Sequence, residues 1–345
     1  MIHASARPLD LHTRAPFGIS RWTHSDFADF VVELTSGGLT GIGEAAPNAR
    51  YGEERGEAMN VLADLAPEIA DAEGPAGVEA VCERLAAASG RPGAVAWPGL
   101  RAGLSAAAWD LAGKQAGEPV WRMLGLEHPS VRTSYTIAIG APDKMLAQAR
   151  AASDFGTLKV KLGFEGDVEL VRALALELPE TTFRYDANEG WDRERAAAAL
   201  AVLEDLGAEL IEQPLPAADA EGIAWLRERT SVPILADEAV LGLDDVDAAA
   251  GIYDGVVVKL SKAGGIASAF SLISACKGRG LQVLLGCMVE SSLGIAAGLQ
   301  LAGLANYVDL DGALLLAEDP FTGISVEGDL LSASDEPGLG VRSAS

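Results

Sequence analysis

Three acidic residues end successive short apolar segments in the second half of the chain. Asp186, Glu212 and Asp237 close the segments TFRYDAN, ELIEQP and PILADE. If these segments are neighbouring strands, three carboxylates meet in one small volume and repel each other unless a cation joins them. Oxygen ligands of this kind suit Mg²⁺ or Mn²⁺. The sequence therefore predicts a metal site at these three strand ends.

Two polar residues next to these ligands are expected to support the site. Asn188 follows Asp186 by two residues, and Glu238 directly follows Asp237. Groups in such positions commonly orient metal ligands. A strand-ending aspartate also occurs as the N-cap of the following helix. Three acidic residues at consecutive strand ends favour the metal site over that alternative.

Lysines flank the carboxylates on both sides. Lys159 and Lys161 in TLKVKLG share one face of the preceding strand, and Lys259 in GVVVKLS ends the following strand. Burying an ammonium group is costly unless it is compensated, and the carboxylates and the metal would provide that compensation. We expect the closeness of the lysines to lower the pKa of at least one of them, which would make it a general base. The alternative is a buried ion-pair network that merely closes this end of the fold.

A base on each side of a metal suggests a reaction class. A metal that chelates a substrate carboxylate stabilises the enediolate formed when the neighbouring carbon loses a proton. With Lys161 and Lys259 on opposite sides, a proton can leave one face and return on the other. The sequence therefore predicts racemisation or epimerisation by 1,1-proton transfer.

A further acidic pair lies in the last apolar segment, YVDLDG. Asp309 and Asp311 share one face of that strand and have no obvious cation partner in the sequence. A free α-amino group on the substrate would supply one. The alternative is that the two aspartates cap a following helix.

These residues must be positioned by a regular succession of strands and helices. After about residue 130, short apolar segments alternate with Ala- and Leu-rich helical stretches at intervals of 22 to 28 residues. The segments are SYTIAIG, TLKVKLG, TFRYDAN, ELIEQP, PILADE, GVVVKLS, QVLLGCM and YVDLDG. Eight such units predict a (β/α)₈-type barrel. Each segment carries its reactive residues at its C-terminal end, where barrels of this type place their active sites.

The first part of the chain has a different pattern. DFADFVVELTSG and GLTGIGEAAP flank Gly37-Gly38 and predict a β-hairpin. Residues 53–72, 76–89 and 100–117 have helical spacing and are rich in Ala, Leu and Glu. We expect an α+β module ahead of the barrel, and irregular last thirty residues that pack back on it.

The composition indicates a globular protein and argues against several partners. The 345-residue chain is 49% hydrophobic and has a net charge of −24, whereas nucleic acid and anionic membranes require a basic surface. Three scattered cysteines do not suggest a disulfide framework or a zinc site. The N-terminus lacks the apolar core of a signal peptide, and no apolar run approaches a membrane span. We expect a soluble cytoplasmic protein, without nucleic-acid or membrane partners, that forms a homo-oligomer as such barrels often do.

The motifs in their order resemble a known family. KVK, DAN, EQP, ADE, VKLSKAGG and LGCM resemble the muconate-lactonising-enzyme subgroup of the enolase superfamily, and the DLDG ending resembles the dipeptide epimerases within it. PFGISR (16–21) and RYGE (50–53) resemble the two mobile cap loops of the family, and AAWDLAGK and PGLGV fit as well. The resemblance covers nearly the whole chain and is specific as a set, whereas EQP or ADE alone carries little weight.

The resemblance implies a fold and a domain division. It implies a modified (β/α)₇β TIM-type barrel over residues 126–315, beneath an N-terminal α+β capping domain over residues 1–125. Residues 316–345 would pack back on the capping domain. One Mg²⁺ would be bound at the mouth of the barrel.

The resemblance also implies a role for each matched residue. Lys161 and Lys259 would be the two acid/base catalysts, and Lys159 would contact the substrate carboxylate and lower the pKa of Lys161. The residues implied to hold the metal are Asp186, Glu212 and Asp237. Those implied to bind the amino terminus of a dipeptide are Asp309 and Asp311.

Other matched residues are implied to form the pocket. Those at strand ends are Thr136, Cys287, Met288 and Val289. Arg21, from a cap loop, would pair with the γ-carboxylate of a substrate glutamate through its planar guanidinium; the alternative is an ordinary exposed arginine. Lys262 falls just past its strand end, so Lys259 is preferred as the base. Glu290 follows the LGCM strand and would tune or crowd the pocket.

The sequence-based prediction is a Mg²⁺-dependent dipeptide epimerase that acts on L-Ala-D/L-Glu in the recycling of murein peptides of the cell wall. One alternative is epimerisation of another dipeptide. N-acylamino acid racemase, o-succinylbenzoate synthase and muconate cycloisomerase activities are others, but their substrates lack the free ammonium that Asp309 and Asp311 suggest. A non-catalytic peptide- or metal-binding barrel is the alternative from a different class, and the intact set of bases and ligands argues against it.

Overall fold

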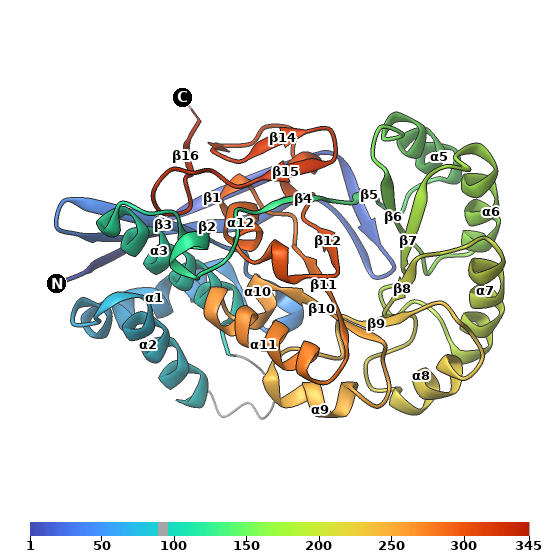
Figure 1. The fold of residues 1–345 in the computed structure, drawn as a ribbon, viewed down its shortest axis with the longest axis horizontal. Coiled ribbons are helices and arrows are strands. Elements are labelled where there is room, and N and C mark those ends of the chain that lie inside the picture. The colour runs from blue at the N-terminus through green and yellow to red at the C-terminus, as the bar shows by residue number, and fades with distance from the viewer. Residues whose placement is uncertain (89–95, 345) are drawn as a thin grey trace.

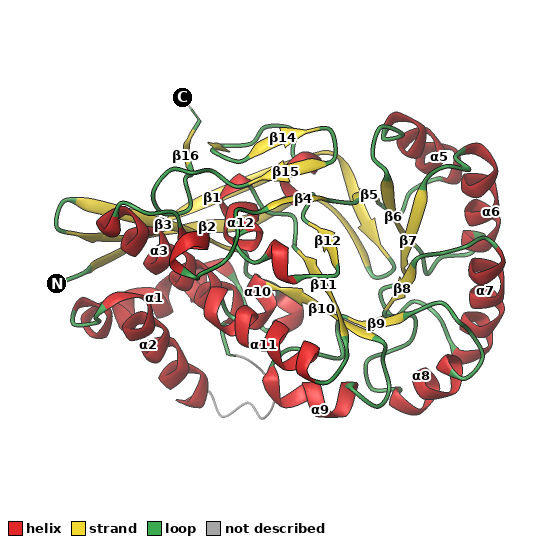
Figure 2. Ribbon diagram, viewed as in Figure 1, coloured by secondary structure: helices red, strands yellow, loops and turns green. Residues whose placement is uncertain are grey.

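The chain forms an N-terminal cap and a barrel, shown as ribbons in Figures 1 and 2. The structure is a computed structural model that describes residues 1–88 and 96–344. Blue to teal elements make up the cap in Figure 1, and green to orange elements make up the barrel. The predicted α/β class, a parallel barrel with an α+β capping domain, is confirmed.

The cap sheet is antiparallel. Its strands follow the order β1 (His3–Ile19), β2 (Trp22–Ser36) and β3 (Leu39–Ala45). Gly37 and Gly38 form the predicted hairpin turn with φ angles of 61° and 80°, which glycine adopts without steric cost. The sequence analysis did not predict β1. Only Leu9 and Leu11 are buried in the central part of this edge strand, so the alternation that identifies a strand is weak.

The predicted cap helices are present as α1 (Arg55–Ala70), α2 (Gly74–Ala88) and α3 (Pro98–Ala116), followed by the short α4 (Val120–Met123). Their ends agree with the predictions within two residues, although the predicted end at residue 89 lies outside the described residues. Helix α3 lies directly on β3, because Cβ atoms at Gly41 and Gly43 would come within 2.2 Å of backbone oxygens of α3. Glycine at these positions permits the close approach of helix and strand.

The barrel strands run parallel and in chain order around the sheet. They are β5 (Tyr135–Ile137), β6 (Thr157–Lys161), β7 (Thr182–Asp186), β8 (Leu210–Glu212), β9 (Ile234–Ala236), β10 (Gly255–Lys259), β11 (Gln282–Gly286) and β12 (Tyr307–Asp309). Each lies within one of the eight predicted segments, so that prediction is confirmed. The backbone N–H of Ser134 donates to the carbonyl of Val308 over 3.2 Å, which joins the first strand to the last.

Helices surround this ring of strands. They are α5 (Pro142–Ala151), α6 (Asp167–Glu177), α7 (Arg193–Asp205), α8 (Ala220–Arg227), α9 (Val246–Ala249), α10 (Leu260–Ala263), α11 (Ile266–Gly278) and α12 (Ser292–Leu299). Helices α5 to α8 form the outer layer along the right side of Figure 1.

Strand alternation divides the barrel interior into layers. Leu210, Leu235 and Val257 belong to a small apolar cluster inside the ring. Each lies two residues before a charged residue of its own segment, namely Glu212, Asp237 or Lys259. Because side chains two apart in a strand share a face, an apolar layer supports a charged layer at the C-terminal strand ends.

The last segment contacts both parts of the fold. It contains the short strands β13 (Phe321–Thr322), β14 (Ser325–Glu327), β15 (Leu330–Ser332) and β16 (Arg342–Ser343), and β15 pairs with β4 (Ser130–Arg132) at the entry to the barrel. The backbone N–H of Ala317 donates to His12 on β1, and that of Leu339 donates to Asp110 on α3, each over 2.8 Å.

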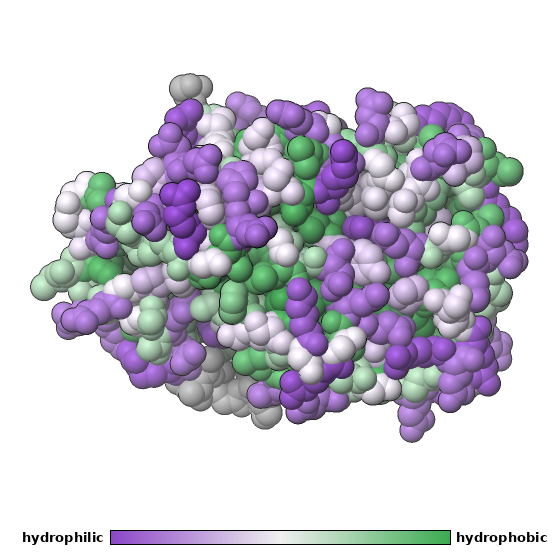
Figure 3. Space-filling view, viewed as in Figure 1, coloured by the Kyte–Doolittle hydropathy of each residue, from purple (hydrophilic) through white to green (hydrophobic). Residues whose placement is uncertain are grey.

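The face of the molecule shown in Figure 3 is mostly hydrophilic around its rim, and apolar residues show between the hydrophilic ones near its middle. Within residues 1–88 and 96–344, the helices lack the combination of length and apolar character needed to cross a membrane.

Candidate active site

A cavity of about 540 Å³ lies between the cap and the C-terminal ends of the barrel strands. The predicted site residues that line it are Arg21, Thr136, Lys159, Lys161, Asn188, Asp237, Glu238, Lys259, Cys287, Met288, Val289, Asp309 and Asp311. Asp186 and Glu212 are fully buried beside these residues. The structure thus brings all the predicted residues together at one end of the barrel.

Three of the charged residues are direct neighbours in the sheet. Lys161 on β6 pairs in register with Asp186 on β7, which pairs with Glu212 on β8. Lys161 Nζ lies 2.5 Å from Asp186 Oδ2. Lys159, two residues earlier on β6, places its Nζ 2.7 Å from Glu212 Oε2. The alternation that puts both lysines on one face therefore directs both ammonium groups at the carboxylates.

Two lysines hold Asp237, one on each carboxylate oxygen. Lys259 Nζ, at the end of β10, lies 2.7 Å from Asp237 Oδ2 and 3.8 Å from Glu212 Oε1. Lys262, fully buried in α10, donates to Asp237 Oδ1 over 2.8 Å. It also donates to the backbone oxygens of Asp237 and Val257, over 2.6 and 2.8 Å. Lys262 therefore supports a carboxylate and does not line the cavity.

Burial and the lysines act in opposite directions on these carboxylates. Burial raises the pKa of Asp186, but the charges of Lys161 and Lys159 outweigh it and the pKa falls to about 2. In the same way, the lysines around Asp237 hold the pKa of that carboxyl well below its usual value. Burial and the nearby charge of Asp186 raise the pKa of Glu212 to about 8.

The sequence analysis expected a lowered pKa for at least one of the lysines, and Lys159 and Lys259 are not that lysine. Burial alone lowers the pKa of Lys159, but the charges of Asp309 and Glu212 more than compensate, and its pKa is raised well above the usual value. The pKa of Lys259 is likewise raised, because the charges of Asp237 and Glu212 outweigh burial. The nearest charges to these ammonium groups are carboxylates rather than other lysines, which explains the difference.

The residues present fit a divalent metal ion. The carboxylate of Glu212 is fully buried, and its contacts with positive groups among the described residues are those with Lys159 at 2.7 Å and Lys259 at 3.8 Å. Since neither contact is a well-formed hydrogen bond, both oxygens could still bind a hard cation. Asp186, Glu212 and Asp237 would hold that ion. Within the described ranges these side chains do not already converge as a ligand set, because lysines draw the carboxylates toward themselves.

Asp309 and Asp311 have different surroundings, and Asp309 has a cation partner that the sequence did not reveal. Lys159 Nζ donates to Asp309 Oδ2 over 2.8 Å, and the hydroxyl of Ser134 donates to the other oxygen over 2.6 Å. Asp311 accepts the backbone N–H of Thr136 over 2.6 Å. Burial, and then the charge of Asp309, raises the pKa of Asp311 to about 7.

Arg21 reaches the site, but protein groups surround its guanidinium. Its Nη2 donates to Glu238 over 2.7 Å. Its Nη1 donates to Glu189 over 2.9 Å and to the carbonyl of Asn188 over 2.6 Å. Asn188 in turn donates its backbone N–H to Asp186 over 2.8 Å. The two predicted supporting residues, Asn188 and Glu238, thus connect the cap loop to the carboxylate row.

Gln213 is a positioning group that the sequence analysis did not single out, although it lies within the EQP motif. Its side-chain oxygen accepts the backbone N–H groups of Asp237 and Ala239, over 3.0 and 3.2 Å. Its φ of 36° lies in the left-handed region, which is costly for a residue other than glycine. Gln213 therefore fixes the backbone that presents Asp237.

The sequence analysis also did not identify the aromatic residues that line the cap side of the cavity. Phe17, Trp22, Phe27 and Tyr51 line it. Phe17 lies within PFGISR and Tyr51 within RYGE, the two segments that resemble the cap loops of the family. Trp22 directly follows the first segment. Glu290, expected to tune the pocket, is buried and does not line it.

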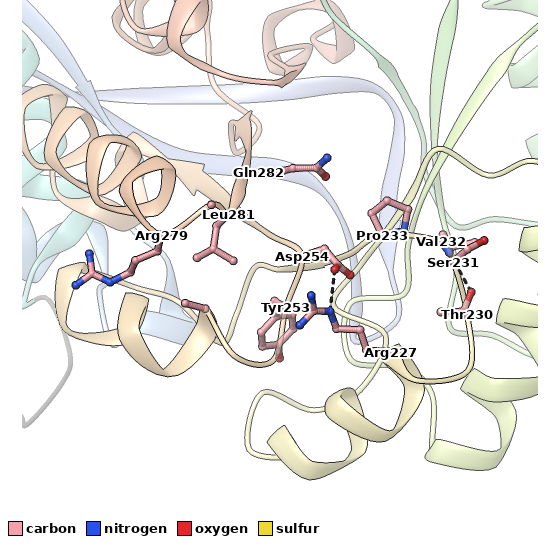
Figure 4. A pocket seen from close by; sticks show the side chains of 12 residues that line it. Arg227, Thr230, Ser231, Val232, Pro233, Tyr253, Asp254, Arg279, Leu281 and Gln282 are labelled. Carbon is pink, nitrogen blue, oxygen red and sulfur yellow. Dashed lines mark hydrogen bonds and ion pairs between the residues drawn. The ribbon is translucent and has the colours of Figure 1, made fainter.

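A second cavity, of about 600 Å³, lies at the opposite end of the barrel. Figure 4 shows its residues, which precede or begin β9 to β11. Arg227 lies 2.7 Å from Asp254, and Arg279 is paired with Asp247. Active sites of such barrels lie at the other end, and the charges here are already paired, so the first cavity is the candidate active site.

Two family models match most of the chain. "Mandelate racemase / muconate lactonizing enzyme, N-terminal domain" matches residues 2–125, and "Enolase C-terminal domain-like" matches residues 144–344.

Characterised proteins resemble the chain over nearly its full length. An L-Ala-D/L-Glu epimerase from Bacteroides thetaiotaomicron is 32% identical, covering 97% of this chain and 86% of the relative. An L-Ala-D/L-amino acid epimerase from Pedosphaera parvula is 36% identical, covering 90% of each. The crystal structure of a dipeptide epimerase from Enterococcus faecalis V583, complexed with Mg and L-Leu-L-Tyr, has a TM-score of 0.92 and 29% identity over 99% of each chain.

Proposed function

This chain belongs to the mandelate racemase / muconate lactonizing enzyme family of the enolase superfamily, and we propose that it is a magnesium-dependent epimerase of dipeptides. The observation that carries the proposal is the order of charged residues along the strand ends. Lys161 and Lys259 lie on either side of a row formed by Asp186, Glu212 and Asp237. An epimerase needs a base and an acid on opposite faces of one carbon next to a stabilised carboxylate.

The residues of the chain divide the reaction among them. When bound, a divalent cation supplies positive charge that stabilises the dianion left after the α-carbon loses its proton. One of Lys161 and Lys259, as the neutral amine, takes that proton on its Nζ. The other, as the ammonium, returns a proton to the opposite face, so the configuration inverts and the proton count balances.

The same carboxylates hold the lysines and would hold the metal. Lys161 is bound to Asp186, and Lys259 to Asp237. A divalent cation held by these carboxylates would supply their positive charge in place of the lysines and would leave both amines able to face the substrate.

Asp309 and Asp311 support a substrate with an amino terminus. Asp309 accepts a buried ammonium, that of Lys159, and so provides a site where a positive nitrogen is stable. A dipeptide ammonium can bind beside it, between Asp309 and Asp311. N-acylated amino acids lack this charge, which favours dipeptides over the N-acylamino acid racemase alternative.

Which dipeptide this enzyme acts on is a separate question from the reaction itself. The relatives' names cover L-Ala-D/L-Glu, other L-Ala dipeptides, hydrophobic dipeptides and L-Lys-D/L-Arg. The sequence-based choice of L-Ala-D/L-Glu, with its place in murein peptide recycling, depends on Arg21 and stays a prediction.

The experiment that tests the proposal is proton NMR of dipeptides in D₂O with enzyme and Mg²⁺. Loss of the α-proton signal of the C-terminal residue, together with conversion between diastereomers, is the expected result. Exchange of N-acylamino acids but not of any dipeptide would move the chain to the racemase branch. Absence of exchange in both groups would overturn the proposal.

A further inference from the structure

Aromatic rings line the cap side of the active-site cavity. Phe17 on β1 and Trp22 and Phe27 on β2 all face it, and each is only half-buried. The ring centroid of Trp22 lies 6.2 Å from the centroids of both other rings, and those two lie 6.5 Å apart. The three rings therefore form one continuous apolar wall, and such rings bury large areas at low entropic cost.

The arginines on this side are already paired with protein carboxylates. Arg21 is held by two of them, as described above. Arg50 Nη2 lies 2.8 Å from Glu189, and Arg55 Nη1 lies 2.5 Å from Asp10. Each of the three arginines that line the cap side of the cavity is thus paired with a protein carboxylate. A substrate γ-carboxylate would have to compete with these protein carboxylates. At Arg21, displacing the buried Glu238 would leave a charge without its partner, which is costly.

Arg21 connects the cap hairpin that carries it to the barrel. The hairpin that carries it is fixed to the barrel by the N–H of Ile139, which donates to the carbonyl of Gly18 over 2.8 Å, and by the hydroxyl of Ser20, which donates to Asn188 over 2.7 Å. The ion pair of Arg21 with Glu238 adds a third connection. Arg21 therefore holds the aromatic wall against the carboxylate row.

A cationic substrate side chain is also poorly matched. Asp29 and Glu53 are buried carboxylates on the cap side. Burial, with the neighbouring charge of Glu44, raises the pKa of Asp29 well above the usual value, and burial raises the pKa of Glu53 to about 7. Asp26 is exposed and lies 2.5 Å from His12. Glu54 is exposed as well, where water and salt weaken its attraction for a cation.

We infer that the cavity selects dipeptides whose epimerised residue carries an apolar side chain, received by Phe17, Trp22 and Phe27. This inference rests on the proposed dipeptide epimerase function and narrows its substrate class. In this inference, Arg21 does not bind a substrate carboxylate. It connects the cap to the barrel through Glu238.

The test is a competition among four dipeptides: L-Ala-L-Phe, L-Ala-L-Leu, L-Ala-L-Glu and L-Ala-L-Lys. The rate of α-proton exchange in D₂O gives kcat/KM for each one with the Mg²⁺-loaded enzyme. We expect L-Ala-L-Phe or L-Ala-L-Leu to exceed L-Ala-L-Glu by about tenfold or more, the range that apolar pocket contacts provide. A kcat/KM for the Glu or Lys dipeptide equal to or above those of the apolar ones would overturn the inference alone. Failure of these four and of every other dipeptide to exchange would overturn the proposed function itself.

A matched pair of variants locates the selectivity. Trp22→Ala removes the central ring of the wall. Trp225→Ala removes a tryptophan of α8 that lies over Arg229, outside the cavity. We expect Trp22→Ala to reduce kcat/KM about tenfold more for L-Ala-L-Phe than for L-Ala-L-Ala, whereas Trp225→Ala leaves that ratio unchanged. An equal reduction for both dipeptides in Trp22→Ala would contradict the apolar subsite, since a merely structural role changes both alike.

Discussion

Lys159 Nζ lies 2.8 Å from Asp309 Oδ2, so this ion pair connects β6 to β12 inside the mouth of the barrel. Both side chains are almost fully buried. Through this pair, the ammonium group of Lys159 lies next to the place where the ammonium group of a substrate would bind. Lys159 consequently stabilises the barrel and also lies beside the proposed substrate site.

Lys159→Met should destabilise the fold by about 3 kcal/mol, because it leaves buried carboxylates without their cation. Asp309→Asn should cost less, since Lys159 keeps its contact with Glu212. The double variant should be less destabilised than the sum of the two single changes. Guanidinium unfolding of the four proteins measures this coupling, and strict additivity would show that the two residues do not interact.

Lys161→Ala and Lys259→Ala should each lower the rate of epimerisation by about 10²–10⁴-fold, the contribution of a positioned base. With one base left, each variant should still exchange the α-proton of one diastereomer without inverting it. Lys277→Ala, an exposed lysine on α11, is the matched control and should keep full activity. Inversion at an undiminished rate in either single variant would refute the two-base scheme.

Glu212→Gln should weaken Mg²⁺ binding by at least about tenfold, because a buried carboxylate that would hold the metal becomes a neutral amide. Titration calorimetry with Mg²⁺ measures this without any substrate. For the natural protein, EDTA should abolish exchange in D₂O, and added Mg²⁺ should restore it. Full activity after exhaustive chelation would contradict the metal requirement.

Lys262→Met should weaken Mg²⁺ binding by about 10–100-fold, although Lys262 lines no part of the cavity. The lysine donates to both the carboxylate and the backbone carbonyl of Asp237 and so fixes the orientation of a ligand. Calorimetry on the folded variant separates this effect from simple loss of stability. Mg²⁺ affinity equal to that of the unsubstituted protein would show that Lys262 only stabilises the barrel.

The barrel could be predicted from the sequence because its signals are local and repeated. In three successive segments an apolar residue lies two positions before a charged one, as Leu210 does before Glu212. The strand-and-helix unit itself recurs at nearly constant spacing. The register of Lys161 with Asp186 and of Asp186 with Glu212 follows from the same order.

The partners of individual charges could not be predicted, because they depend on contacts between distant segments. Lys159 and Asp309 are 150 residues apart, and neither motif indicates the other. The pairing of Arg21 with Glu238 joins cap and barrel over 217 residues. From the sequence alone, an arginine in a loop is predicted to be free to bind a substrate. Only the fold shows which carboxylates it already pairs with.

Glu53 should make the stability of the protein depend on pH. Its carboxylate accepts the backbone N–H groups of Gly99 and Leu100 at the start of α3, yet burial raises its pKa to about 7. Between the ordinary glutamate pKa and pH 7 the folded protein therefore holds a proton that the unfolded chain has lost. The free energy of unfolding should be highest at low pH on account of this group and decrease, by a few kcal/mol at most, as the pH rises through 7.

Urea unfolding at pH 5, 6, 7 and 8 of the natural protein and of Glu53→Gln tests this dependence. Glutamine keeps an oxygen that accepts a backbone N–H but cannot ionise, so the variant should lose less stability than the natural protein between pH 5 and 8. Glu33→Gln is the matched control, because Glu33 lies on the cap sheet, partly exposed and paired with Arg7. If Glu53→Gln and Glu33→Gln follow the same pH profile as the natural protein, Glu53 is ionised throughout, and the start of α3 is held by a carboxylate rather than by a carboxylic acid.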